Sequence, residues 1–270
     1  MAETVFDESE RRAWAGQADA YAASFAKLCA YPVPELLRVA EVRRGVRLLD
    51  VGTGTGTVAA AACARGARVT AVDAEPGMVA RAAQAAPEAD VRLASLPRLP
   101  FADAEFDAVV GNFVLNHVGR PGEALRELRR VTRPGGRIAV TVWAVPPAAG
   151  QALLGRAVQA AGVVRPADLP TLAPEDDFPR SEQGFAALLD EAGLLNPACG
   201  TLVWNHRTTR EEWWSGPAAG VATIGQLVTR QAPAVIAEIK EHFDLLSGEF
   251  TGPDDVLVLP HAALIAHGQA

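Results

Sequence analysis

Short apolar segments alternate with helical patterns through the first half of the chain. Between these segments lie stretches with helical spacing, and two of them begin with a proline, Pro76 and Pro121, at a suitable first helical position. Apolar strands that alternate with helices are typical of a mostly parallel sheet covered on both faces. The pattern therefore predicts a doubly wound α/β core with strands at residues 46–51, 68–73, 90–94, 106–112 and 137–143.

A separate helical pattern precedes this core. The sequence DESE at residues 7–10 fits a capping box, in which a side chain and a backbone N–H pair reciprocally at the start of a helix. Beyond it, Trp14, Tyr21, Phe25 and Leu28 recur at offsets of 7, 4 and 3 residues. This spacing predicts a helix that carries its aromatic side chains on one face.

The regular alternation of strand and helix patterns ends near residue 145. A proline-rich, acidic stretch at residues 165–179 marks a boundary or a lid. The elements expected after it are a helix near 181–193, a strand near 199–206, a helical stretch from 209 to about 247, and a final strand near 255–266. The two late strands bring the predicted sheet to seven.

Composition and charge narrow the classes of function. The chain has 270 residues, 49% of them hydrophobic, and 25 basic against 32 acidic residues give a formal charge of -7. This length allows one large domain with a sizeable core. An acidic balance lacks the electrostatic footprint of a nucleic-acid binder, so we expect no nucleic-acid partner.

The first residues and the cysteines bear on location and on metal binding. The start, MAETVFDESERR, lacks the apolar core of a signal peptide, and no apolar stretch is long enough to cross a bilayer. We therefore expect a cytoplasmic protein without a membrane partner. Cys29, Cys63 and Cys199 are widely separated and form no C-x-x-C pair, which favours buried free thiols over a disulfide framework or a zinc site. No metal site is expected.

The first strand leads into a loop with three glycines. Asp50 precedes the loop, and Gly52, Gly54 and Gly56 follow at alternate positions. The dinucleotide motif G-x-G-x-x-G needs a glycine where Thr57 stands. An acid beside the loop also repels a phosphate and favours a ligand with an ammonium group. Glycine-rich turns occur for close packing as well, so the loop alone leaves both interpretations open.

A second acid follows the next strand. Asp73 lies 21 positions beyond Gly52, where an acid in this fold accepts hydrogen bonds from both hydroxyls of an adenosine ribose. Ligands of such sheets bind beyond the carboxyl ends of the strands. We therefore expect one crevice to be formed by residues 50–56, 73–78, 94–97 and 111–117.

These motifs together resemble a known family, the class I S-adenosylmethionine (SAM)-dependent methyltransferases, and within it the small-molecule branch similar to the ubiquinone and menaquinone biosynthesis enzymes. The first motif of that family is similar to LLDVGTGTGTVA, and the second to VTAVDAEPGMVARA. The adenine and fourth-strand region resembles LASLPRLPFADAEFDAVV, and the stretch into the fifth strand resembles HVGRPGEALRELRRVTRPGGRIAVTVW. The resemblance covers about residues 46–143 and implies a Rossmann-like fold, SAM as the cofactor, S-adenosylhomocysteine as its product, and a small organic acceptor.

The resemblance also implies contacts to the cofactor by position. The backbone around Gly52 and Gly54 would hold the methionine part, Asp73 would accept from the ribose hydroxyls, and Asn112 would contact the amino-acid end. Ser95 stands where many relatives have an acid that accepts from the adenine amine, so this bond is expected to be weaker or shared with the backbone. The other implied contacts come from Tyr21, Asp50, Thr53, Gly56, Ala74, Met78, Leu96 and Phe113.

Methyl transfer itself requires little covalent help, because the reaction depends mainly on holding the acceptor near the methyl group in a dry cavity. His117, just after the fourth strand, is the best-placed candidate for a general base, although capping or packing would also explain a histidine there. By the resemblance, residues 1–40 would form lid helices, 41–145 the SAM-binding core, and 146–270 an acceptor cap with the last strands, all in a single domain. The pocket for a hydrophobic or aromatic acceptor would be lined by Trp14, Phe25, Trp143, His206 and Trp214, with Trp213 beside them.

Three alternatives stay open at this point. A nicotinamide-dependent oxidoreductase would use the same sheet and Asp73, but Thr57 and Asp50 count against it. A protein of this fold can also bind SAM and catalyse a cyclisation or decarboxylation instead, because fold does not settle chemistry. A third possibility is a SAM-binding protein that is not an enzyme. The sequence leaves both a monomer and a homodimer open.

Overall fold

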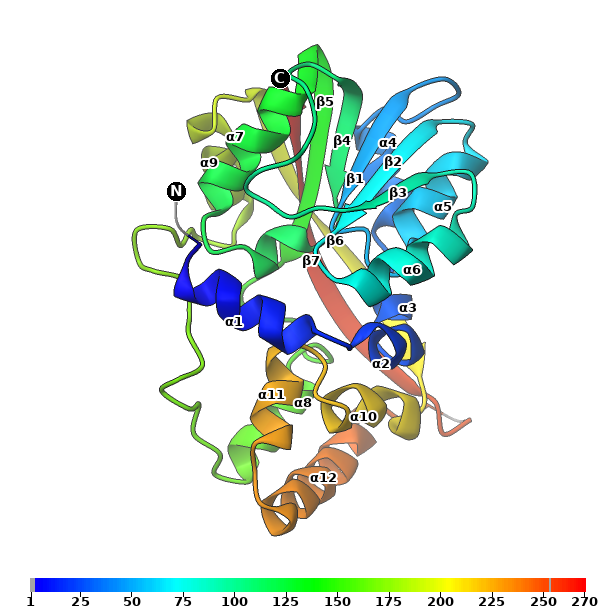
Figure 1. Ribbon diagram of the computed structural model, residues 1–270. Coiled ribbons are helices and arrows are strands. Elements are labelled where there is room, and N and C mark those ends of the chain that lie inside the picture. The colour runs from blue at the N-terminus through cyan, green and yellow to red at the C-terminus, as the bar shows by residue number, and fades with distance from the viewer. Residues whose placement is uncertain (1–2, 253) are drawn as a thin grey trace.

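Seven strands form one sheet, as the sequence predicts. The structure is a computed structural model that describes residues 3–252 and 254–270 (Figure 1). Across the sheet the strands follow the order β3-β2-β1-β4-β5-β7-β6. The strands are β1 (Arg47–Val51), β2 (Arg68–Asp73), β3 (Asp90–Leu93), β4 (Phe106–Gly111), β5 (Thr132–Trp143), β6 (Leu195–Thr208) and β7 (Leu257–Gln269).

The first five strands pair in parallel, and β7 lies antiparallel between β5 and β6. The chain leaves β1 toward β2 on one side and later returns to β4 on the other, so a crevice opens beyond the carboxyl ends of β1 and β4. β6 is longer than predicted because it pairs with β7 from Leu195 to Thr208.

Helices cover both faces of the sheet (Figure 1). They are α4 (Val33–Val39), α5 (Thr57–Ala64), α6 (Pro76–Ala85), α7 (Pro121–Val131) and α9 (Glu182–Glu191). Consecutive residues of a strand point to opposite faces. Accordingly Leu48 belongs to the core completed by α4 and α5, Leu49 belongs to the core completed by α7 and α9, and both side chains are completely buried. The predicted doubly wound architecture is confirmed.

A third apolar core lies at the ends of the strands, beneath the sheet in Figure 1. Trp213 and Phe243 from its helices pack there with Leu257 and Leu259 from β7. Within residues 3–252 and 254–270, no helix is long and apolar enough to cross a membrane. The helices of this region are α8 (Leu153–Ala160), α10 (Arg210–Ala218), α11 (Ala222–Thr229), α12 (Pro233–Ser247) and the short η2 (Gly248–Phe250).

Three short helices replace the single helix expected near the N-terminus, and the predicted capping box is wrong. Gly16 has a φ of +72°, a left-handed conformation that turns the chain after the first helix. The first helix is capped by Thr4: its hydroxyl accepts from the N–H of Asp7, whose carboxylate accepts from the N–H of Thr4. Asp7 is therefore the third helical residue and not the cap. The helices are α1 (Val5–Trp14), α2 (Ala18–Ala23) and α3 (Ala26–Cys29).

Candidate functional site

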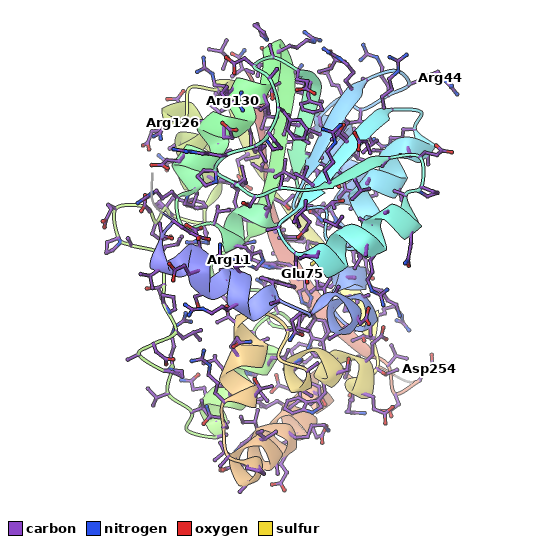
Figure 2. All side chains as sticks on the ribbon, viewed as in Figure 1. Arg11, Arg44, Glu75, Arg126, Arg130 and Asp254 are labelled. Carbon is purple, nitrogen blue, oxygen red and sulfur yellow. The ribbon has the colours of Figure 1, made fainter. Side chains whose placement is uncertain are left out.

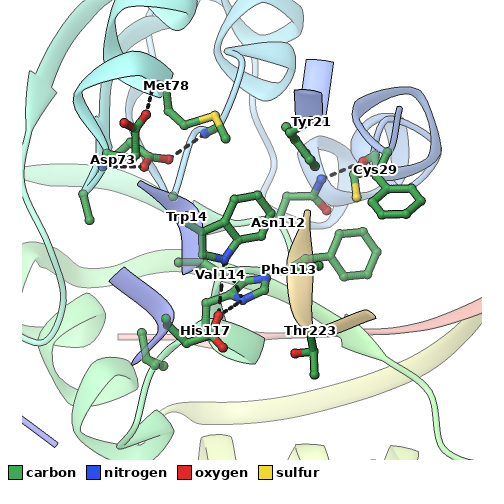
Figure 3. A pocket seen from close by; sticks show the side chains of 18 of the residues that line it. Trp14, Tyr21, Cys29, Asp73, Met78, Asn112, Phe113, Val114, His117 and Thr223 are labelled. Carbon is green, nitrogen blue, oxygen red and sulfur yellow. Dashed lines mark hydrogen bonds and ion pairs between the residues drawn. The ribbon is translucent and has the colours of Figure 1, made fainter. Parts of the chain in front are cut away.

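The carboxyl ends of five strands meet at one cavity with a volume of about 940 Å³. Residues from α1, α2 and α11 line the same cavity, so the first helices and the late helices enclose the strand ends (Figures 1 and 3). The structure thus brings together the strand-end segments that the sequence marks. One residue at or just after each of these strands lines the cavity: Val51, Asp73, Leu93, Asn112 and Trp143.

The lining of the cavity carries more negative than positive charge. Five carboxylates and a single guanidinium lie along it. A cleft lined by one sign of charge attracts ligands of the opposite sign. The cavity therefore favours a ligand with positive charge. The charged side chains are those of Glu3, Asp7, Glu10, Asp73, Glu75 and Arg11.

The glycine loop contains one glycine needed for packing and another that faces the ligand space. Gly56 precedes α5 with a φ of +85°, and a Cβ there would lie 2.8 Å from the Cα of Ala82. Gly54 has a φ of +56° and lines the cavity, and a Cβ there would meet only a ring carbon of Tyr21, at 3.6 Å. Close packing therefore explains Gly56, whereas Gly54 leaves its part of the cavity wall open.

Asp50 lies behind the loop and does not line the cavity. Its side chain is completely buried, and its Oδ2 accepts a hydrogen bond from Thr53 Oγ1 at 2.6 Å. Its Oδ1 is buried with no partner in the part of the chain that the structure describes. Burial raises the pKa of Asp50 to about 7, although the Thr53 bond acts in the opposite direction. Asp50 is therefore a weaker and more distant charge than its sequence position suggests.

Asp73 is held at the end of β2 by two backbone amides. Its Oδ2 accepts from the N–H of Gly54 at 2.8 Å, and its Oδ1 accepts from the N–H of Glu75 at 3.0 Å. Burial raises the pKa of Asp73, while these N–H groups favour its charged form. Each carboxylate oxygen keeps a free lone pair. Asp73 can therefore still accept hydrogen bonds from hydroxyl groups in the cavity (Figure 3).

Further positions expected to contact the cofactor continue along the wall from Asp73. Ala74, Met78, Ser95 and Leu96 all line the cavity, and Met78 is buried. The start of α6 is capped by Glu75, which accepts from the N–H of Met78 at 2.7 Å. The wall is mostly apolar here, and Ser95 supplies a hydroxyl.

The side chain of Asn112 forms hydrogen bonds with other residues of the protein. Its Nδ2 donates to the carbonyl of Cys29 at 2.7 Å, and its Oδ1 accepts from the Thr141 hydroxyl at 2.8 Å. That hydroxyl also accepts from the N–H of Phe113 at 2.8 Å. Asn112 therefore fixes the end of β4 against α3, and a role in binding an amino-acid group would fall mainly to its backbone.

His117 forms a cluster with two residues of α1. It follows β4 in the short helix η1 (Val114–His117). Its Nδ1 lies 2.7 Å from Glu10 Oε2, and the same oxygen lies 3.2 Å from Trp14 Nε1 (Figure 3). A carboxylate only accepts, so the contact with Glu10 assigns a proton to Nδ1 of His117. Glu10 thereby orients both the histidine and the tryptophan.

Two of the aromatic residues that were predicted to line the acceptor pocket do not line the cavity. His206 is almost completely buried and packs against Trp213, with ring centroids 5.3 Å apart. Trp214 stacks on Phe243 in the third core. Neither His206 nor Trp214 lines the cavity. The aromatic residues that do line it are Trp14, Tyr21, Phe25, Phe113, Trp143 and Trp213.

Sequence reasoning missed several polar lining residues, among them Glu10, Gln151 and His261. Glu10 stands four residues before Trp14, a spacing that places two side chains on one helical face, so this pair could have been found. Gln151 and His261 belong to segments without a recognisable motif, and only the folded chain brings them to the cavity.

Comparison with known proteins agrees with this geometry. A family model described as a methyltransferase domain matches residues 49–140. A demethylmenaquinone methyltransferase of Beutenbergia cavernae is 39% identical over 160 residues, which are 56% of this chain and 66% of that protein. The chain spans between 42% and 66% of the length of the first curated relatives that it matches.

Solved structures share the fold. A protein of Anabaena variabilis, described as a methyltransferase from an antibiotic biosynthesis pathway, superposes with a TM-score of 0.62 at 17% identity, over 88% of this chain and 96% of that one. The [4+2]-cyclase SpnF superposes with a TM-score of 0.53 at 21% identity, over 91% of this chain and 82% of that one. At these identities the likeness concerns the fold alone.

Proposed function

We infer that the chain is a SAM-dependent methyltransferase, because residues 49–140 match a methyltransferase domain and the strand ends of that domain open into a cavity of about 940 Å³. One observation carries the inference. The Asp73 carboxylate and the bare backbone of Gly54 lie side by side on the cavity wall, 2.8 Å apart at Oδ2 and N. This pairing suits a ribose next to a methionine chain, and the excess of carboxylates suits a ligand with a sulfonium and an ammonium group.

The residues of the site would act mainly by holding and enclosing the reactants. When bound, SAM supplies an electrophilic methyl carbon on a positively charged sulfur. The loop at Gly52 and Gly54 and the carboxylate of Asp73 would fix its position. Trp14 and Tyr21, whose rings meet edge to face with centroids 5.5 Å apart, would exclude water and favour a cation. Orientation of this kind supplies a large part of the rate of a displacement.

The acceptor we propose is a small hydrophobic or aromatic compound, of the quinone or secondary-metabolite kind. The aromatic lining of the cavity supports this choice, and the demethylmenaquinone methyltransferase relatives agree with it. We propose further that the protein works in the cytoplasm, as a monomer or a homodimer, without nucleic acid or membrane as a partner. The division into lid, core and acceptor cap at residues 40 and 145 is part of the same proposal.

The proposed function is tested with SAM labelled at the methyl group. We expect the label to move to members of a panel of hydroxylated aromatic and quinol compounds, and SAM to raise the melting temperature of the protein. A melting temperature raised by NAD(H) but not by SAM would point to an oxidoreductase. Turnover of a compound without loss of label from SAM would point instead to a cyclisation or decarboxylation.

The role of His117 is tested with the best acceptor from that panel. Loss of an oriented hydrogen bond to the acceptor is worth about 1.4 kcal/mol, so His117→Ala should lower kcat about tenfold and leave the Kd of SAM unchanged. Glu10→Gln should lower kcat less, because it disturbs only the orientation of the ring. Steady-state rates and calorimetry with SAM measure the two quantities.

A matched control lies on the same helix. Arg12 is exposed on α1, and Glu8 is its only partner within residues 3–252 and 254–270, so Arg12→Ala should leave kcat unchanged. A loss of kcat well below tenfold in His117→Ala would show that His117 lines the cavity without acting as a base.

A further inference from the structure

Five aromatic rings form a continuous wall on one part of the cavity, and none of them carries a formal charge. The rings of Phe113 and Trp143 stack with centroids 4.1 Å apart. His261 follows at 6.1 Å from Trp143, Trp213 at 5.5 Å from His261, and Phe25 at 5.1 Å from Trp213. All five residues line the cavity. We call this set the aromatic wall: Phe25, Phe113, Trp143, Trp213 and His261.

His261 is the only member of the aromatic wall that offers a hydrogen-bond acceptor from its side chain. Its ring is almost completely buried, and its Nδ1 lies 2.9 Å from the carbonyl oxygen of Leu259. A carbonyl only accepts, so Nδ1 carries the proton and Nε2 presents a lone pair. Burial, the largest cause, lowers the pKa of His261 to about 4, and the ring therefore stays neutral at physiological pH.

The Nε2 atom of His261 has no protein partner. Among residues 3–252 and 254–270 the only hydrogen bond of this side chain is the one to Leu259, and the other contacts of the ring are with aromatic rings. Because His261 lines the cavity, a partner for this acceptor can come from a bound ligand. An acceptor with this surrounding is suited to a hydrogen-bond donor on a flat ligand.

Trp213 adds a polar group of the opposite kind. Its indole N–H is buried and has no partner among the described parts of the chain. A ring of the ligand would lie against the aromatic faces, since aromatic pairs prefer stacked or edge-to-face contacts. The wall thus combines apolar area with the unpartnered acceptor of His261, while the indole N–H of Trp213 is buried.

We propose that the aromatic wall binds a neutral, flat aromatic acceptor through a hydroxyl group that donates to Nε2 of His261. The proposal rests on the proposed function and deepens it, because it names the substrate class and the residue that selects it. A carboxylate in place of the hydroxyl would be rejected, since a neutral histidine cannot offset its charge and the other charged groups of the cavity are mostly acids. His261 is a binding and specificity residue in this account.

Binding of three matched probes to the protein loaded with S-adenosylhomocysteine tests the proposal without turnover. The probes are 2-naphthol, 2-methoxynaphthalene, which lacks the donated hydrogen, and 2-naphthoate, which is charged. We expect 2-naphthol to bind about tenfold more tightly than either of the others, the factor for one hydrogen bond. Ligand-observed NMR titration measures the three Kd values. Equal Kd values for 2-naphthol and 2-methoxynaphthalene would overturn the proposal.

Variants assign the preference to His261. In His261→Phe the preference for 2-naphthol over 2-methoxynaphthalene should disappear, while His261→Gln, which keeps an acceptor near Nε2, should retain part of it. His206→Phe is the matched control, because His206 lies in the same aromatic cluster, 6.2 Å from His261, but does not line the cavity. An unchanged preference in His261→Phe would overturn the assignment.

The binding of S-adenosylhomocysteine to each variant separates this proposal from the proposed function. The affinity for the nucleoside should be the same in wild type and His261→Phe, because no residue of the adenosyl site is changed. Absence of nucleoside binding in the wild type would contradict the proposed function. Normal nucleoside binding without a preference for 2-naphthol would contradict only the role of His261.

Discussion

Replacing Asp73 by alanine is expected to weaken SAM binding by about 1–3 kcal/mol, or roughly 5- to 150-fold in Kd. The substitution removes the acceptor proposed for the ribose hydroxyls. It also leaves the N–H of Gly54 without its bond to Oδ2, so the loop that faces the ligand loses a support. Isothermal calorimetry with SAM measures the change in Kd.

Two variants control this prediction. Asp73→Asn keeps one acceptor oxygen and should lose less affinity than Asp73→Ala. Asp90→Ala removes an exposed carboxylate at the start of β3 and should leave the Kd unchanged. In the described part of the chain this carboxylate bonds only to Arg92. A near wild-type Kd in Asp73→Ala would contradict the adenosyl site itself.

Much of the central sheet could be predicted from the sequence because its inner strands are apolar on both faces. In β1, for example, Leu48 and Leu49 point to different cores and both are completely buried. Such a segment cannot be a half-exposed strand, and it is too short for an ordinary helix. The position of the crevice then follows from the rules of doubly wound sheets.

The N-terminal region could be predicted only in part. Trp14 and Tyr21 do contact each other and line the cavity, as the helical spacing implies. The break at Gly16 was not predicted, because an isolated glycine inside a helical pattern is also tolerated. The helical spacing therefore marked the right side chains, but the chain reaches their positions through a turn.

The candidate site could be predicted where a residue follows a strand end and not elsewhere. Asp73 and Gly54 are fixed by local strand-to-helix turns, so their positions carry over from the motif. The burial of Asp50 depends on how the loop packs over it, which the motif does not specify. His261 comes from β7, which lies next to β5 in the sheet but more than a hundred residues away in sequence. No local sequence pattern indicates that it lines the cavity. His206, which was predicted to line the acceptor pocket, packs against Trp213 and lies outside the cavity.

The substitution Gly54→Val is expected to have the largest effect on SAM binding, a loss of at least about 100-fold in Kd, or about 3 kcal/mol. A valine there would place two methyl groups in the space proposed for the methionine part. Its backbone would also have to keep a φ of +56°, which is strained for a β-branched residue by about 1–3 kcal/mol. In the protein alone the new side chain has room, because the nearest atom to its Cβ is a Tyr21 ring carbon at 3.6 Å. We therefore expect a folded protein that fails to bind SAM.

A second glycine, which does not line the cavity, separates the effect of backbone strain from the effect of filling the ligand space. Gly135 has a similar φ of +71°, and nothing lies within 4 Å of a Cβ built on it. Gly135→Val should therefore show the cost of backbone strain without any contact to the ligand. Both variants should lower the melting temperature by a similar amount, and only Gly54→Val should raise the Kd of SAM, because only there does the side chain enter the cavity. If Gly54→Val bound SAM within tenfold of the wild-type affinity, the methionine part would have to lie elsewhere, and the loop would serve packing alone.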